Sequence, residues 1–130
     1  MDHSQDLEYI LDYYQNPRNY CELPDADISL QGGNPGCGDI VTVYLKFNGD
    51  RLDQITYTGQ GCTISQAATS MLTELLPGKT IDEIEALDFH LLEEMLGEDL
   101  VKMRPKCSTL GLDTVKFATQ TYKRDHRLDQ

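Results

Sequence analysis

Hydrophobic and polar residues alternate along two neighbouring segments of the chain, "DIVTVYLKF" (39–47) and "RLDQITYTG" (51–59). Alternation is typical of strands with one buried face, and the intervening "NGD" favours a tight hairpin turn. We therefore predict a β-hairpin, and an isolated hairpin needs a further strand or a covering layer of helices to be stable in water. The segment "DISL" (27–30) is a candidate short strand. The buried face of the hairpin would consist of Val41, Val43, Leu45, Phe47, Leu52, Ile55 and Tyr57.

Apolar residues in other segments recur at intervals of three and four, which is the helical period. The N-terminal segment is predicted to form one short helix that ends at Asn16-Pro17, because a residue before proline avoids the helical region. Its apolar face would consist of Leu7, Ile10, Leu11 and Tyr14. A longer helix is predicted over residues 63–76, ended by Pro77-Gly78. Its buried face would consist of Ile64, Ala67, Ala68, Met71, Leu72, Leu75 and Leu76.

Residues that can cap helices indicate three more helices in the second half of the chain. Thr80 and Glu83 match the capping-box pattern for a short helix through residue 87. Asp88 can cap a helix through residue 96 that Gly97 closes. Ser108 can cap a last helix. The buried face of that last helix would consist of Gly111, Val115, Ala118 and Tyr122.

Strands that precede helices in the chain indicate an α+β fold. We expect a small antiparallel sheet of about three strands, covered on one face by helices. The length of 130 residues fits a single domain that spans residues 1–130. We find no internal repeat and no low-complexity segment in the sequence.

The balance of charge narrows the range of partners. The chain has 22 acidic and 11 basic residues, a formal net charge of −11. Such a charge repels polyphosphate backbones, so we expect no nucleic-acid ligand. No apolar run approaches the ~20 residues that span a bilayer, and the N-terminus shows no signal peptide. We therefore expect a soluble, cytoplasmic protein that does not act at a membrane.

The four cysteines, Cys21, Cys37, Cys62 and Cys107, form no C-x-x-C pair. In a reducing cytosol, dispersed cysteines are more often buried residues, metal ligands or catalytic thiols than disulfides. Three of them lie where predicted elements meet, in "GNPGCGD" (33–39), "GQGCTIS" (59–65) and "RPKCSTL" (104–110). Cys21 has neither a flanking glycine nor a helix start beside it, so we interpret it as a packing or loop residue.

Two of the cysteines, Cys62 and Cys107, directly precede predicted helices, whose positive N-terminal ends favour a thiolate. Lys106 adds positive charge beside Cys107. Asp39 follows Cys37 by two positions, and residues i and i+2 of an extended segment point the same way. Three sulfurs and one carboxylate would complete a four-ligand set for Zn²⁺ or for an iron–sulfur cluster. The spacing alone leaves such a site and a set of inert thiols equally open.

At these residues the sequence resembles the U-type iron–sulfur scaffold family, which comprises IscU, SufU and the N-terminal domain of NifU. Four ordered segments carry the resemblance: "YYQNPRN" (13–19), "GNPGCGD", "GQGCTIS" and "KCSTL" (106–110). The resemblance covers nearly the whole chain, and four ordered segments are much more specific than any one of them. It implies the SufE/NifU-like fold, a small antiparallel sheet with helices on one side.

The resemblance also implies a function. Members of this family assemble a [2Fe–2S] cluster from iron, supplied by an iron donor, and sulfur, supplied by a cysteine desulfurase. They then transfer the cluster to apo iron–sulfur recipient proteins. By position, Cys37, Asp39, Cys62 and Cys107 would be cluster or metal ligands, Cys107 would accept persulfide sulfur, and Lys106 would be an accessory residue. Such a scaffold has no turnover of its own, and it can be a homo-oligomer.

The chain departs from the known branches in ways that keep a second function open. IscU proteins carry histidine before the third cysteine, whereas this chain has Lys106, as SufU does, and an ammonium cannot ligate while protonated. The segment "LVKMRPK" (100–106) is not the chaperone-recognition motif of IscU. SufU has an insertion between the second and third cysteines, and the interval from Cys62 to Cys107 is too short to contain it. The alternative function is a zinc-dependent sulfurtransferase that uses the same four ligands.

Overall fold

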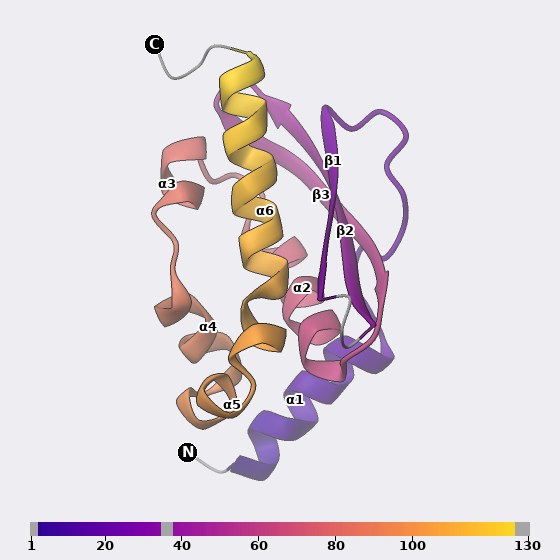
Figure 1. Ribbon diagram of the computed structural model, residues 1–130, viewed down its shortest axis with the longest axis vertical. Coiled ribbons are helices and arrows are strands. Elements are labelled where there is room, and N and C mark those ends of the chain that lie inside the picture. The colour runs from indigo at the N-terminus through magenta and orange to yellow at the C-terminus, as the bar shows by residue number, and fades with distance from the viewer. Residues whose placement is uncertain (1–2, 35–37, 127–130) are drawn as a thin grey trace.

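The computed structural model describes residues 3–34 and 38–126. Figure 1 shows the sheet along one side of the molecule, α2 and α6 beside it, and α3, α4 and α5 on the far side of α6. The predicted α+β architecture is confirmed. The elements in chain order are α1 (His3–Gln15), β1 (Ile28–Asn34), β2 (Asp39–Asn48), β3 (Arg51–Gln60), α2 (Thr63–Leu75), α3 (Ile81–Glu85), α4 (Phe89–Leu96), α5 (Glu98–Met103) and α6 (Pro105–Asp125).

The sheet has three antiparallel strands in the order β1-β2-β3. The predicted hairpin is formed by β2 and β3, and Gly49 in its turn has a φ of 64°. Every residue predicted for the buried face of the hairpin is at most 8% exposed, whereas Thr42, Tyr44 and Lys46 on the opposite face are only half-buried. Only one face of β2 is therefore completely covered, as the alternation predicted.

The strand β1 is longer than the four residues predicted for it and continues through Gly32 and Gly33 to Asn34. These glycines pair with Val41 and Ile40 of β2. A glycine is a poor strand residue in isolation, and here the pairing with β2 outweighs that preference. The missing side chain also has a use in packing, because a Cβ on Gly32 would lie 2.0 Å from Oγ1 of Thr114 on α6.

The two long helices α2 and α6 cross in close contact at a glycine. A Cβ on Gly111 of α6 would lie 2.2 Å from Oγ1 of Thr69 on α2, which is completely buried. The predicted buried face of α6 is confirmed. On α2 the predicted face is buried except at Leu75, which is 45% exposed, and Ile64, which is partly buried. The apolar core therefore lies between the sheet and these two helices.

The cap predictions for the middle helices are confirmed. Thr80 Oγ1 accepts a hydrogen bond from the Glu83 amide at 3.1 Å, and the Glu83 carboxylate accepts one from the Thr80 amide at 2.9 Å. The helix itself ends at Glu85, two residues earlier than predicted. Asp88 accepts a hydrogen bond from the His90 amide at 2.9 Å, and Gly97 ends α4 with a φ of 91°.

The last part of the chain differs from the expectation in two ways. The helix α5 was not predicted, because its six residues, which begin directly after Gly97, are too few to show a helical period. The prediction that the last helix begins at Ser108 is wrong, because α6 begins at Pro105. Proline is well suited to the first position of a helix because its missing N–H has no partner there. Ser108 is consequently inside the helix and completely buried.

The prediction of an apolar face on α1 is also wrong. Of its four predicted residues only Ile10 is buried, and Leu7 is 53% exposed. Polar contacts hold the helix instead: the Tyr13 hydroxyl donates to Glu74 of α2 at 2.5 Å. The "NPRN" segment that follows α1 is attached to α2 in the same way. The Arg18 amide donates to Ser70 Oγ at 2.9 Å, and the Asn19 side chain donates to Thr73 Oγ1 at 3.0 Å.

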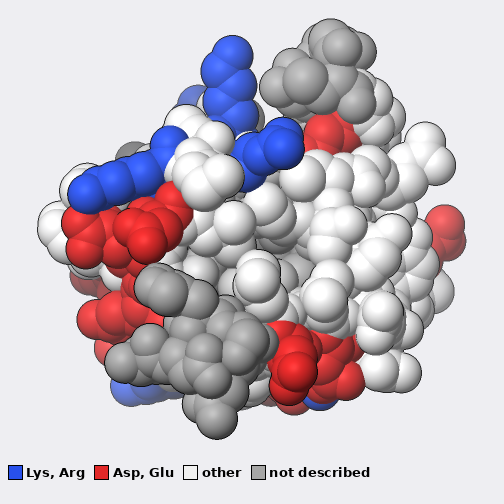
Figure 2. Space-filling view, turned by 90° about the horizontal axis from the view of Figure 1, so that it is seen from below, with Lys and Arg blue, Asp and Glu red and all other residues white. Residues whose placement is uncertain are grey.

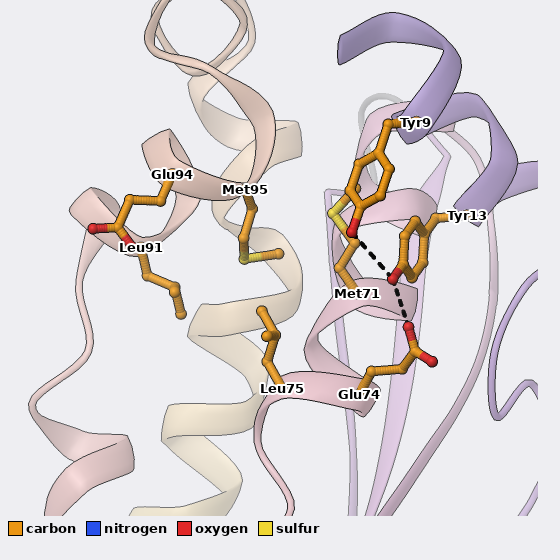
Figure 3. Close-up of a pocket in the computed structure, with 8 residues that line it drawn as sticks. All are labelled: Tyr9, Tyr13, Met71, Glu74, Leu75, Leu91, Glu94 and Met95. Carbon is orange, nitrogen blue, oxygen red and sulfur yellow. Dashed lines mark hydrogen bonds between the residues drawn. The ribbon is translucent and has the colours of Figure 1, made fainter. Parts of the chain in front are cut away.

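A cavity of about 280 Å³ separates α1 from α4. Figure 3 shows Tyr9 and Tyr13 of α1 on one side of it and Leu91 and Met95 of α4 on the other. Met71 and Leu75 of α2 lie between them (Figure 3), and Tyr9 is 57% exposed. The helix α1 therefore packs on α2 with a gap toward α4, and it contributes little apolar burial to the fold.

We expect α1 to open before the rest of the fold does. A helix with one buried apolar residue has a low local unfolding free energy, and its amides should be protected at least ~100-fold less than those of β2. Native-state hydrogen exchange of the metal-free protein measures this directly. Equal protection of α1 and β2 would show that its polar contacts are as stabilising as the core.

We expect Gly111→Ala to destabilise the fold. The added Cβ must displace Thr69 or push the two helices apart. Overpacking of this kind typically lowers the free energy of unfolding by about 1–3 kcal/mol. Denaturant unfolding measures the loss. The double variant Gly111→Ala, Thr69→Ala provides the control, because removal of the Thr69 hydroxyl makes room for the new methyl group and should restore part of the stability. No restoration would mean that the contact with Thr69 is not the cause.

Candidate metal centre

Three of the four predicted ligands meet at one place in the structure. Asp39, Cys62 and Cys107 each offer a ligand atom, and these atoms lie within 4.8 Å of one another. They come from the start of β2, the residue before α2 and the first turn of α6. The fourth predicted ligand, Cys37, lies outside the described residues. The group therefore offers two sulfurs and one carboxylate within reach of one centre.

The sheet register explains how Asp39 and Cys62 come together. Ile40 at the start of β2 pairs with Gln60 at the end of β3, so the chain leaves β3 beside Asp39. Gly61 then turns the chain into α2 with a φ of 126°. A Cβ on Gly61 would lie 2.7 Å from both Cα and Oδ1 of Asp39. Only glycine fits at this position, and the close approach brings Cys62 next to the carboxylate.

The crossing of α2 and α6 adds Cys107 to the group. Gly111, at the close contact with Thr69, lies four residues after Cys107, which is about one helical turn. Thr69 similarly lies about two helical turns after Cys62, the residue that directly precedes α2. The contact of the two helices therefore fixes the separation of the two thiols, although the residues are far apart in the chain.

Asp39 is a buried carboxylate, 2% exposed, that is held by the first turn of α2. The Ser65 hydroxyl donates to Asp39 Oδ1 at 2.6 Å. The Gln66 side-chain amide lies 3.5 Å from the same oxygen and donates to the Ile40 carbonyl at 3.3 Å. A buried carboxylate is unfavourable unless it is hydrogen-bonded or ligates a cation, and this arrangement provides the first of these.

The two thiols are half-buried, and the prediction that their helix ends favour thiolates does not hold for Cys107. Burial, together with the neighbouring Cys62 and Asp39, raises the pKa of the Cys107 thiol to about 12. Cys107 also lies inside the first turn of α6 and not before it. The neutral thiol is therefore favoured at pH 7 in the metal-free protein, and a cation beside it would lower this pKa and favour the thiolate.

The predicted accessory residue Lys106 is exposed on the first turn of α6, beside the exposed Lys102 and Arg104. Figure 2 looks onto the end of the molecule that carries α5 and the start of α6. It shows Lys and Arg side chains gathered at one edge, acidic groups at others, and uncharged surface between them. Lys102 forms an ion pair with Glu98 at 2.6 Å. Lys102, Arg104 and Lys106 are therefore three exposed basic residues close to Cys107 in the chain.

Cys21, interpreted from the sequence as a packing or loop residue, is an exposed residue of the connection between α1 and β1 and does not join the group. Ser65 and Gln66, the two residues that hold Asp39, were not predicted from the sequence. A signal for them exists, because "TISQAATS" places polar side chains on the face of α2 that its apolar residues bury. Among the described residues, no helix has the length and apolar character to cross a membrane.

Comparisons with known proteins identify the family of the chain. The family described as NifU-like N terminal domain matches residues 5–128. A protein named iron-sulfur cluster assembly scaffold protein IscU 1, from Archaeoglobus fulgidus, is 38% identical over 115 residues, which cover 88% of this chain and 74% of that protein. A protein of Bacillus subtilis named zinc-dependent sulfurtransferase SufU is 32% identical over 121 residues, 80% of this chain and 82% of that protein.

Solved structures share the fold. A candidate iron–sulfur cluster assembly scaffold of the SUF system from Fervidobacterium islandicum superposes with a TM-score of 0.73 at 30% identity, over 86% of this chain and 94% of that one. The N-terminal part of a NifU-like protein from Brucella abortus, 21% identical, superposes with a TM-score of 0.78 over 95% of this chain and 99% of that one. The match over residues 5–128 and the identities above 30% establish that the chain belongs to the NifU-like N-terminal domain family.

Proposed function

We infer that the chain is a scaffold on which a [2Fe–2S] cluster is assembled and from which it is transferred to recipient proteins. Cys37, Asp39, Cys62 and Cys107 would ligate the cluster, which is the cargo of the protein, within a single domain of residues 1–130. The observation that carries this proposal is the convergence of Asp39, Cys62 and Cys107 within 4.8 Å. The names of its relatives from Archaeoglobus fulgidus and Aquifex aeolicus support it.

The donor set suits a cargo that must be both held and released. Thiolates bind soft iron–sulfur centres firmly, and the carboxylate of Asp39 is the weaker and more exchangeable ligand. Asp39 is nevertheless held in place by Ser65, so its carboxylate is already oriented before a metal binds. The site therefore combines two firm ligands and one labile ligand among the described residues.

Sulfur would reach this site from a cysteine desulfurase, and iron from an iron donor. Cys107 would first lose its proton, which a cation bound beside it would favour, and its thiolate would attack the outer sulfur of a desulfurase persulfide. A sulfur–sulfur bond forms at Cys107, the one on the desulfurase breaks, and the desulfurase cysteine leaves as a thiolate. Oxidant and reductant are not needed for this exchange. The exposed Arg104 and Lys106 beside Cys107 favour the approach of an anionic persulfide.

A second candidate function is the zinc-dependent sulfurtransferase. The Bacillus subtilis relative carries that name, and Lys106 stands before the third cysteine. Two sulfurs and a carboxylate fit three positions of a tetrahedral Zn²⁺ site, and Cys37 would supply the fourth. When bound, Zn²⁺ would supply the positive charge that keeps these thiols ionised. Cys107 would then leave the metal to accept sulfur from the desulfurase.

Anaerobic purification with metal analysis separates the two functions. A scaffold is expected to hold two irons per cluster with visible charge-transfer absorption, and a sulfurtransferase to be colourless with one zinc. In either case Cys62→Ala and Cys107→Ala should abolish stable loading, and Cys37→Ala should do the same. Cys21→Ala is the matched control and should load normally, because Cys21 lies outside the group. Normal loading of the Cys62 and Cys107 variants would refute the proposed site.

The variant Asp39→Ala tests the role of the carboxylate. Loss of the exchangeable oxygen ligand should lengthen the lifetime of a loaded cluster in air, by about tenfold if exchange begins at this ligand. The decay of visible absorption after reconstitution measures the lifetime. A shorter lifetime would assign Asp39 a holding role instead of a releasing one.

The raised pKa of Cys107 leads to a prediction on pH. In the metal-free protein the thiolate is scarce at pH 7, and because the pKa lies near 12 the alkylation rate of Cys107 should rise about tenfold per pH unit between pH 7 and 10. Mass spectrometry after iodoacetamide treatment measures it, with the exposed Cys21 as an internal comparison. Zn²⁺ should protect Cys107 at every pH, and EDTA should remove the protection. Rapid alkylation that does not change with pH would contradict the raised pKa.

A further inference from the structure

We propose that Ser65 is a positioning residue that fixes Asp39 as a ligand through one oxygen only. The inference rests on the proposed ligand set and goes beyond it, because Ser65 contacts no metal itself. Its hydroxyl donates to Asp39 Oδ1 at 2.6 Å, and both residues are buried, Ser65 completely and Asp39 to 98%. A hydrogen bond to a carboxylate of this length is charge-assisted and strong.

The hydroxyl has a choice of acceptors, which makes its role specific. Ser65 Oγ also lies 2.9 Å from the Cys62 carbonyl, the usual partner of a serine in the first turn of a helix. A serine has one proton, and the shorter contact with a charged acceptor is the stronger of the two. The Gln66 side-chain amide donates to Ser65 Oγ at 3.2 Å, which orients the hydroxyl toward Asp39.

The surroundings of Asp39 leave only one oxygen for a metal. Oδ1 is enclosed by Ser65, by the more distant Gln66 amide, and by the backbone at Gly61, where an added Cβ would lie 2.7 Å away. Within residues 3–34 and 38–126, Ser65 and Gln66 both contact Oδ1, and the other hydrogen-bond partner of the carboxylate is the thiol of Cys107, itself a proposed ligand. The orientation of the carboxylate is thus set by α2, the same helix that Cys62 precedes. The Cys62 sulfur and the Asp39 oxygens are therefore positioned by the same helix.

The consequence is that Ser65 sets how firmly the site holds a metal. Without the hydroxyl, the carboxylate can rotate and present both oxygens or neither, and it loses the partner that compensates its burial. Loss of a residue that orients a metal ligand typically weakens metal affinity 10–100-fold. We expect Ser65→Ala to raise the dissociation constant for Zn²⁺ by at least about tenfold.

The test is a chelator competition titration of the full chain with Zn²⁺. A Co²⁺ titration followed by thiolate–cobalt absorption provides a second readout. Ser70→Ala is the matched control. Ser70 is also a completely buried serine of α2, but its hydroxyl oxygen accepts a hydrogen bond from the Arg18 amide and does not contact Asp39. The control should bind Zn²⁺ like the unaltered chain. In an Asp39→Ala background, Ser65→Ala should have no further effect on affinity.

The outcomes distinguish a failure of the proposed function from a failure of the proposed role of Ser65. If the unaltered chain binds no Zn²⁺ or Co²⁺ through its thiols, the proposed function fails. If it binds normally and Ser65→Ala binds equally well, only the role of Ser65 is refuted. An equal loss with and without Asp39 would also refute it, because Ser65 would then act through the fold.

A crystal structure of the zinc-loaded unaltered chain decides the point even if Ser65→Ala does not fold. We expect one Asp39 oxygen on the metal and the other still bonded to Ser65. Two Asp39 oxygens on the metal, or a Ser65 hydroxyl turned to the Cys62 carbonyl, would overturn the proposal.

Discussion

The contact between Gly111 and Thr69 is the constraint on which the candidate site depends. The two helices that deliver Cys62 and Cys107 can approach this closely only because α6 has no side chain at the crossing. Gly32 has the same effect where β1 meets α6. The sheet, α2 and α6 therefore pack very closely against one another, and the candidate ligands lie where these three elements meet. A larger residue at either glycine would move a thiol without touching the site itself.

The electrostatics of the site follow from this packing. A buried carboxylate and two half-buried thiols share a small volume, which favours the neutral form of Cys107 and requires hydrogen bonds for Asp39. Such a group is stable without a metal but becomes a strong ligand set once a cation compensates the charge. Under the proposed function, the same groups would serve a protein that exists both empty and loaded.

The sequence predicted the parts of this fold that follow a local rule. Alternation identified β2, β3 and their buried face, and capping residues identified α3 and α4, because these signals involve residues close together in the chain. It failed where a distant contact decides. The glycines of β1 pair with residues of β2 that lie nine and seven positions further along the chain, and polar contacts with α2 hold α1 in place of an apolar face. The start of α6 at Pro105 was a local signal that was overlooked, because proline is well suited to the first position of a helix. For the site, motif resemblance pointed to Asp39, Cys62 and Cys107. Ser65 was missed because its contact with Asp39 arises only when α2 meets β2, and the raised pKa of Cys107 was missed because it arises only when α6 joins them.

The distances along the chain between the ligands have a thermodynamic consequence. Cys107 lies 45 residues after Cys62, and Asp39, at the start of β2, lies 23 residues before Cys62. A centre assembled from such remote positions does not exist in the unfolded chain, since closing these long loops is entropically unfavourable. Loading would then follow folding and would stabilise only the native state, by an amount set by ligand concentration and affinity. Occupancy of the site would therefore appear as a raised melting temperature, and the empty protein would unfold more readily than the loaded one.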